Sequence, residues 1–203
     1  PDLIVDVVDA SNLRRNLYLT TQLLELGRPM IVVLNMMDLA ERRGLRIDAE
    51  ELSRRLKVPV IPMVAAKRQG TDRLNACIRE QLLEGGGTTP PFLFPPPFEQ
   101  GIGRIAEELS GDNGRDSPSY ARAEALRRLF DGRKGCAGAL GCCRAAPSTV
   151  LVDAVRGELA SSHGFQPDSA EAQFRYGFIK DLTRGVMQVP DGRPVTWTDR
   201  IAA

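Results

Sequence analysis

The sequence has few of the residues that metal sites use most. Its 203 residues include one histidine, His163, and four cysteines, none in Cys-x-x-Cys spacing: Cys77, Cys136, Cys142 and Cys143. Zinc ribbons and redox pairs are built from closely spaced Cys and His residues. We therefore expect no Cys/His metal site, and we expect reduced thiols as in cytosolic proteins.

Aromatic residues and an excess of one charge are also scarce. Aromatics make up 5% of the chain, and 27 Lys and Arg face 26 Asp and Glu, for a net charge of +1. Proteins that bind nucleic acid usually carry a clear basic surplus, so we expect no nucleic-acid partner. No run approaches the roughly 18 apolar residues of a membrane span, and no signal peptide is visible, so the chain itself is expected to be soluble.

The first 84 residues alternate apolar runs of strand length with amphipathic helical patterns. The apolar runs are Ile4–Val8, Met30–Leu34 and Val58–Val64, and the helical patterns cover 15–26, 48–57 and 71–84. Continuous apolar strands that alternate with helices are typical of parallel βαβ units covered on both faces. This part is therefore predicted to be an α/β fold with a parallel sheet.

The chain changes character after residue 84. Residues 85–97 are rich in glycine and then in proline, which predicts a linker. Beyond it, helical patterns predominate, over 98–109, 119–130, 149–162 and 169–189. We expect three parts: an α/β domain at 1–84, a linker at 85–97 and a small all-α helical domain at 98–203.

Two polar loops follow consecutive predicted strands. Asn35-Met36-Met37-Asp38 comes directly after the run 30–34, and Ala65-Ala66-Lys67 follows the run 58–64. Ligands of α/β sheets bind at the carboxyl ends of the strands. A single Asn-x-x-Asp also fits a loop with an Asx turn, but the second loop makes a binding site the better interpretation.

The chemistry of these loops suits guanine. A carboxylate at Asp38 can accept both the ring imino proton and the exocyclic amine of guanine, whereas adenine offers no such pair of donors. Asn35 would brace the loop and touch the base, the backbone N–H of Ala66 could donate to the guanine carbonyl, and the Lys67 stem could cover the ring. The predicted guanine-binding residues are Asn35, Met36, Asp38, Ala65, Ala66 and Lys67.

The same region resembles the G domain of FeoB-type ferrous iron transporters. The resemblance lies in Asp9–Leu13 (DASNL), Arg15–Thr20 (RNLYLT), Gln22–Gly27 (QLLELG) and Val33–Asp38 (VLNMMD), and again in Phe174–Ile179 (FRYGFI) and Thr198–Ile201 (TDRI). It implies the C-terminal half of a P-loop-GTPase-like parallel sheet followed by the helical domain of that family.

The resemblance also implies a function and partners. It implies a GTP-hydrolysing switch that binds GTP or GDP with Mg²⁺ and is coupled to Fe²⁺ transport. The expected partners are the N-terminal half of the G domain and a downstream transmembrane iron-permease domain. The expected location is the cytoplasmic face of the inner or plasma membrane.

One departure from the family pattern concerns the phosphates. No Gly-x-x-x-x-Gly-Lys-Ser/Thr occurs, and no Asp-x-x-Gly precedes the first strand. We therefore expect a fragment that does not hydrolyse GTP by itself, with Mg²⁺ ligands outside this chain and with the strand Ile4–Val8 at an open sheet edge. An alternative is a non-catalytic interaction or regulatory module derived from a GTPase. A ribosome-assembly GTPase is disfavoured by the near-neutral charge and the helical second half.

Overall fold

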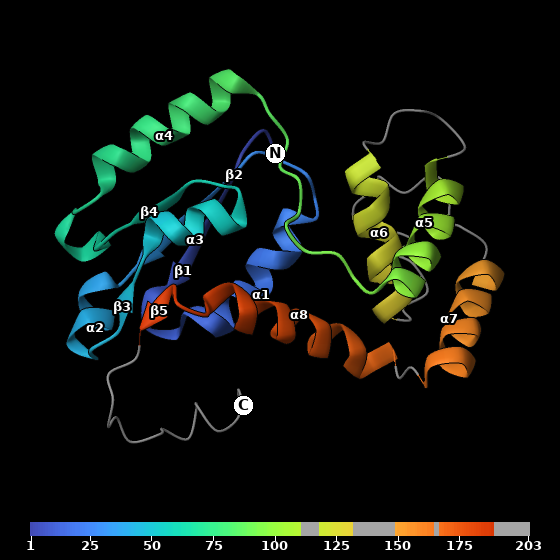
Figure 1. Cartoon of the computed structure of the whole chain (residues 1–203). Coiled ribbons are helices and arrows are strands. Elements are labelled where there is room, and N and C mark those ends of the chain that lie inside the picture. The colour runs from blue at the N-terminus through green and yellow to red at the C-terminus, as the bar shows by residue number, and fades with distance from the viewer. Residues whose placement is uncertain (111–117, 132–148, 165–166, 189–203) are drawn as a thin grey trace. The chain divides into compact units, whose positions relative to one another are not determined.

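The computed structural model describes residues 1–110, 118–131, 149–164 and 167–188 (Figure 1). They form two compact units. Of the described residues, the first, here the α/β unit, contains 1–24, 28–91 and 176–188; the second, here the helical unit, contains Glu25–Gly27 and those within 92–175. The TDRI motif at 198–201 and three cysteines (Cys136, Cys142 and Cys143) lie outside the described residues.

A three-stranded parallel sheet forms the centre of the α/β unit. Its strands are β1 (Ile4–Asp9), β2 (Met30–Asn35) and β4 (Val60–Pro62), in the order β1-β2-β4. The central strand β2 is buried from its first residue to its fifth, because helices cover both faces of the sheet. The predicted parallel α/β arrangement is therefore present.

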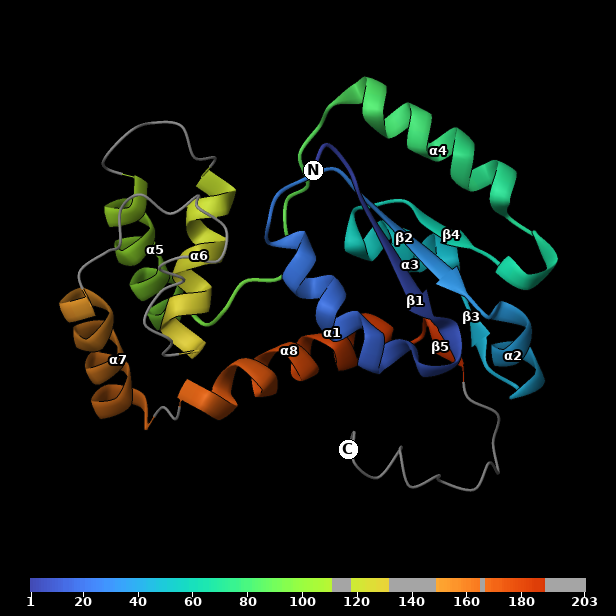
Figure 2. The same ribbon diagram turned by 180° about the vertical axis from the view of Figure 1, so that it is seen from behind.

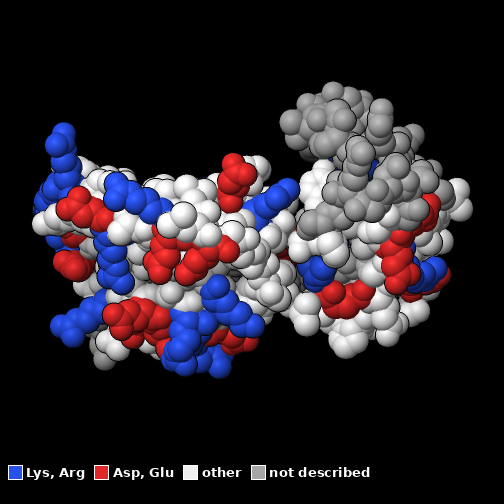
Figure 3. All heavy atoms as spheres, turned by 90° about the horizontal axis from the view of Figure 1, so that it is seen from above, with Lys and Arg blue, Asp and Glu red and all other residues white. Residues whose placement is uncertain are grey.

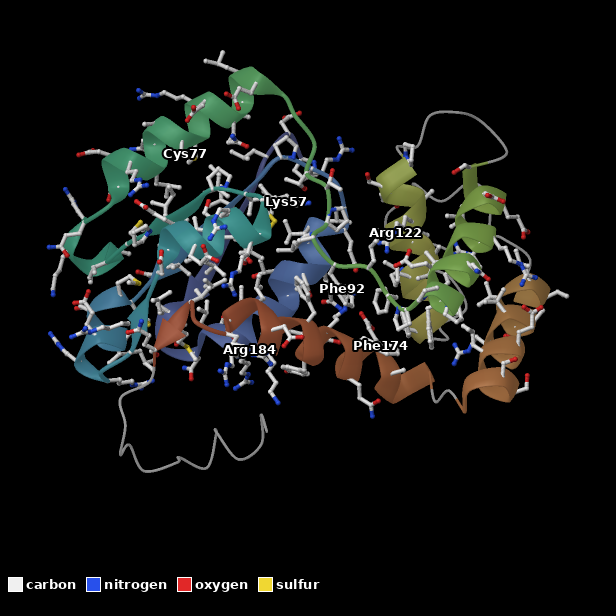
Figure 4. All side chains as sticks on the ribbon, in the orientation of Figure 1. Lys57, Cys77, Phe92, Arg122, Phe174 and Arg184 are labelled. Atoms are coloured by element: carbon white, nitrogen blue, oxygen red, sulfur yellow. The ribbon has the colours of Figure 1, made fainter. Side chains whose placement is uncertain are left out.

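Three helices cover the sheet (Figure 2). Helices α1 (Leu13–Leu24), which follows the 3-10 turn η1 (Ala10–Asn12), and α3 (Ala49–Leu56) pack on the face that carries Val32. Helix α4 (Thr71–Glu84) covers the other face through Cys77, whose side chain is buried on the inner side of that helix (Figure 4).

The sequence pattern indicated the start of α3 correctly. The Asp48 carboxylate accepts a hydrogen bond from the Glu51 N–H at 2.9 Å, so Asp48 is the N-cap. Helix α4 covers the expected range, and its N-cap is Gly70, with no hydrogen bond from a capping side chain.

Three short elements were not expected. They are helix α2 (Met37–Arg42) and the antiparallel strands β3 (Arg46–Ile47) and β5 (Met187–Gln188). The helical pattern at 169–189 was too long, because α8 (Pro167–Thr183) ends at Thr183 and the chain then turns to pair with β3.

The end of α8 is held by α3. The Arg55 guanidinium donates from Nη1 to the carbonyls of Leu182 at 2.9 Å and Arg184 at 2.8 Å. Ile179 and Leu182 are buried in the same core cluster as α1 and α3. The predicted domain division at 98–203 stays a prediction, and the packing adds that residues 176–188 belong to the α/β unit.

The described residues of the helical unit form three helices and the first part of α8. The helices are α5 (Pro96–Ser110), α6 (Pro118–Asp131) and α7 (Thr149–His163). An aromatic cluster fills its core: Phe94, Phe98 and Phe130 are buried, and Phe92 and Phe174 (labelled in Figure 4) are packed against them.

A buried ion pair lies in the same unit. The Arg175 guanidinium donates to the Glu25 carboxylate at 2.9 Å, and their side chains are 1% and 5% exposed. Among the helices that the structure describes, none is both long enough and apolar enough to cross a membrane. The face seen in Figure 3 carries basic and acidic side chains interspersed, as the balanced composition indicates.

Candidate functional site

The first predicted loop begins where β2 ends. Asn35 is the last residue of the strand, Met36 is the N-cap of α2 and Asp38 lies in the first helical turn. Met36 adopts a left-handed backbone conformation, with φ 61° and ψ 33°, and its side chain is exposed. A non-glycine residue in this region is uncommon; Arg68, directly after the second loop, is another, and Lys57 at the C-cap of α3 is a third.

The second predicted loop follows β4 and lies beside the first. It forms a 3-10 turn, η2 (Ala65–Lys67), whose residues are all exposed. The amide Oδ1 of Asn35 accepts the Ala65 N–H at 3.1 Å, and the Met37 N–H points to the carbonyl of Met63 at 3.4 Å. These contacts tie the two loops together at the carboxyl edge of the sheet.

Tight backbone contacts close the second loop. Val64 and Gln69 exchange two backbone hydrogen bonds, of 3.1 and 3.2 Å, and Gly70 follows with φ 88°. A Cβ atom at Gly70 would lie 2.6 Å from the carbonyl oxygen of Pro62, so only glycine fits there. The loop is therefore fixed by its backbone, although its side chains face solvent.

An ion pair joins the two loops through their side chains. Lys67 Nζ lies 3.0 Å from Asp38 Oδ2, and Arg42 Nη2 approaches the same oxygen at 4.0 Å. The hydrogen bond from Lys67, with the attraction of both cations, lowers the pKa of the Asp38 carboxyl below its ordinary value. Asp38 is thus an ionised acceptor at neutral pH.

All six predicted site residues therefore lie at one edge of the sheet. Asn35, Met36 and Asp38 come from the first loop, and the three residues of η2 come from the second. The edge combines an ionised acceptor, exposed backbone and one large exposed apolar side chain, that of Met36. This combination can hold a planar heterocycle that carries adjacent N–H donors.

A third loop at this edge was not among the predicted site residues. After β1, the Asp9 carboxylate accepts hydrogen bonds from the Ser11 N–H at 2.8 Å and the Asn12 side chain at 2.9 Å. Arg43 Nη1 donates to Ser11 Oγ at 2.9 Å. The spacing of Asp9, Ser11 and Asn12 is an Asx-turn signal that the sequence did offer, whereas the contact with Arg43 depends on the fold.

No metal cluster accompanies these loops in the part of the chain that the structure describes. Within it, no group of three or more His, Cys, Asp or Glu residues is placed to hold a metal ion.

Comparison with known proteins places the chain in a family. The family model described as ferrous iron transport protein B matches residues 1–78. The cytosolic domain of Legionella pneumophila FeoB has a similar structure, with a TM-score of 0.71 and 30% identity over 92% of this chain and 68% of that one. The chain belongs to the FeoB family. Its fold is accordingly a partial G domain with a helical part, as expected.

Other FeoB proteins are also similar to this chain. The Fe(2+) transporters FeoB of Salmonella typhimurium and Escherichia coli K12 are each 57% identical to this chain over 77 residues. That stretch is 38% of this chain and 10% of each transporter. The mGMPPNP-bound NFeoB of S. thermophilus matches with a TM-score of 0.74 and 26% identity over 95% of this chain and 70% of that one. The match thus spans about a tenth of the length of the curated relatives.

Proposed function

We propose that this chain contributes the guanine-recognising half of a G domain and a helical domain to a GTP-dependent Fe²⁺ transporter at the cytoplasmic face of a membrane. The observation that carries the proposal is the joining of the two loops through Asn35 and Ala65 at 3.1 Å, with Asp38 on the first loop. Similar FeoB structures are described as bound to GDP or mGMPPNP.

Each predicted residue has a role in this proposal. The Asp38 carboxylate accepts the ring imino proton and the exocyclic amine of guanine, and the Ala66 N–H donates to the base carbonyl. The Asn35 side chain accepts a hydrogen bond from the Ala65 N–H and so keeps the two loops at a fixed distance from each other. The side chain of Met36 and the stem of Lys67 cover the faces of the ring, since both are exposed beside Asp38.

The remaining parts of the nucleotide site belong to other segments of the parent protein. We propose that the phosphate-binding loop and the Mg²⁺ ligands lie in the N-terminal half of the G domain, which pairs with the free edge of β1. A transmembrane iron-permease domain completes the transporter, and Fe²⁺ is its cargo. Val5 and Val7 on β1 are exposed, which supports a further covering segment there.

Replacement of Asp38 by asparagine tests base recognition directly. Xanthosine has a carbonyl where guanosine has its amine, so the side-chain amide that Asp38→Asn introduces can donate to it. We expect Asp38→Asn to weaken guanosine binding about tenfold or more and to favour xanthosine instead. The measurement is a titration of the 203-residue chain with guanosine, xanthosine and adenosine, observed by NMR at the Ala66 amide.

Glu41→Gln is the matched control, because Glu41 is an exposed acid one turn further along α2. It should leave the guanosine titration unchanged. Equal binding of adenosine and guanosine by the unaltered chain would contradict the proposal.

A further inference from the structure

Lys67 occupies the acceptor that guanine would need. Its ammonium lies 3.0 Å from Asp38 Oδ2, so the second loop already donates to the carboxylate of the first. The two side chains are 49% and 29% exposed, which makes the pair accessible from solvent.

A bound guanine and Lys67 would both donate hydrogen bonds to Asp38. The base carbonyl and the two N–H donors lie along one edge of guanine, and this edge would face Ala66 and Asp38 together. Lys67 is the next residue after Ala66, and its ammonium presents N–H donors to Asp38 as that base edge does. A carboxylate offers about four lone-pair sites, but Lys67 and the base edge would both approach Asp38 from the side of η2, so we expect them to compete for the same site on Oδ2.

We infer that Lys67 is an internal competitor for Asp38, so that the Lys67–Asp38 ion pair must open before guanine binds. This inference rests on the guanine site proposed above. Arg42 does not compete in the same way, because it reaches Asp38 only at 4.0 Å, from one turn further along the same helix, and is 73% exposed. The competition lowers the affinity of the site for the base.

The size of the effect follows from the exposure of the pair. Ion pairs at a protein surface contribute little and are screened by salt. Removal of the competing ammonium is therefore expected to strengthen guanosine binding about two- to fivefold. Guanosine carries no charge, so salt acts on the protein's own ion pair and not on the attraction of the ligand.

The test compares Lys67→Met with Arg68→Met in the full 203-residue chain. Arg68 is the next residue, is exposed and belongs to the same loop, so its replacement removes one positive charge without removing the ammonium at Asp38. We expect Lys67→Met to bind guanosine about two- to fivefold more tightly. We also expect the affinity of the unaltered chain and of Arg68→Met to rise with added salt, and that of Lys67→Met to stay constant.

A ligand-free measurement accompanies the titration. NMR of the Asp38 carboxyl should show its pKa moving up in Lys67→Met and not in Arg68→Met. Weaker or unchanged guanosine binding by Lys67→Met would overturn the inference while leaving the guanine site intact. If guanosine bound none of the proteins, the proposed function itself would fail.

Discussion

Thr20 is a hydrogen-bond partner of a buried acid in β1 and helps to make its burial tolerable. Its hydroxyl donates to the Asp6 carboxylate at 2.6 Å, and the two residues are 0% and 8% exposed. Burial raises the pKa of Asp6 above its ordinary value, and the hydrogen bond from Thr20 offsets part of that rise. The sequence placed Asp6 inside a strand but could not name its partner, which lies on α1.

Thr20→Val should destabilise the chain by about 1–3 kcal/mol at pH 7, because the ionised carboxylate loses its donor. The variant raises the folded-state pKa of Asp6 further. Unfolded Asp6 is the same in both proteins, so the cost depends only on the two folded-state pKa values of Asp6. Both are raised, so the cost should shrink as the pH falls through them, already above the ordinary pKa of aspartate. Urea unfolding at a series of pH values measures this.

An Asp6→Asn background provides the control for that experiment. With no titrating group at position 6, the effect of Thr20→Val should no longer change with pH. If the loss of stability caused by Thr20→Val did not change with pH while Asp6 is present, the Thr20 hydroxyl would not act through the Asp6 carboxylate.

At the scale of elements, close packing of α5 on α7 depends on a glycine. A Cβ atom at Gly101 would lie 2.7 Å from Val155 Cγ1, whereas one at Gly103 on the same helix meets nothing within 4 Å. Gly101→Ala should destabilise the chain by about 1–3 kcal/mol through overpacking. Gly103→Ala should stabilise it by about 0.5–1 kcal/mol through helix propensity. Urea unfolding followed by circular dichroism distinguishes the two signs, and equal effects would contradict the packing.

The junction of α8 with β5 depends on one side chain of α3. Arg55 donates to the carbonyl of Leu182 in the last turn of α8 and to that of Arg184 just beyond the helix. The Asp48 N–H donates to the Val186 carbonyl at 2.9 Å. Arg55→Ala should cost about 1–2 kcal/mol and speed hydrogen exchange of the amides at 184–188.

Arg54→Ala is the control for Arg55→Ala, because the Arg54 side chain is 76% exposed and pairs only locally with Glu51. It should leave exchange at 184–188 unchanged. Equal acceleration in both variants would show that Arg55 does not hold this junction.

At the scale of the whole molecule, the exposed side of β1 is the feature that most affects behaviour in solution. In the described part of the chain, β1 pairs with β2 alone, and Val7 is 58% exposed. Exposed apolar edge strands favour pairing with another chain. We expect the isolated chain to self-associate, and Val7→Lys to weaken that association about tenfold, since burial of a valine is worth about 1.5 kcal/mol or more.

Sedimentation velocity at several concentrations measures this association. Leu93→Lys is the matched control, because Leu93 is 68% exposed, belongs to the helical unit and gains the same charge. If Leu93→Lys reduced association as much as Val7→Lys, general charge and not the β1 edge would be responsible.

Much of the α/β unit followed from local patterns. The apolar run of β2 and the cap at Asp48 were readable because strand burial and capping act over a few residues. The sequence also predicted that Asn35 and Ala65 lie close together, because the carboxyl ends of parallel strands meet at one edge of the sheet. Guanine binding by these loops stays a proposal.

Other features were invisible in the sequence because they join residues far apart. Strands β3 and β5 have two residues each, too few for a periodic pattern, and about 140 residues separate them. The end of α8 at Thr183 depends on that pairing and on Arg55.

The sequence by itself determined the parallel sheet, the balanced charge and the polar loops at the strand ends, because propensity, burial and charge are local properties. The FeoB-like motifs already indicated the family. Only the tertiary structure decided that Lys67 contacts Asp38, that Thr20 contacts Asp6 and that residues 176–188 pack in the α/β unit. These contacts join segments that lie far apart in the sequence. Folding of the core brings those segments within hydrogen-bond range, and a local sequence pattern does not encode which segments become neighbours.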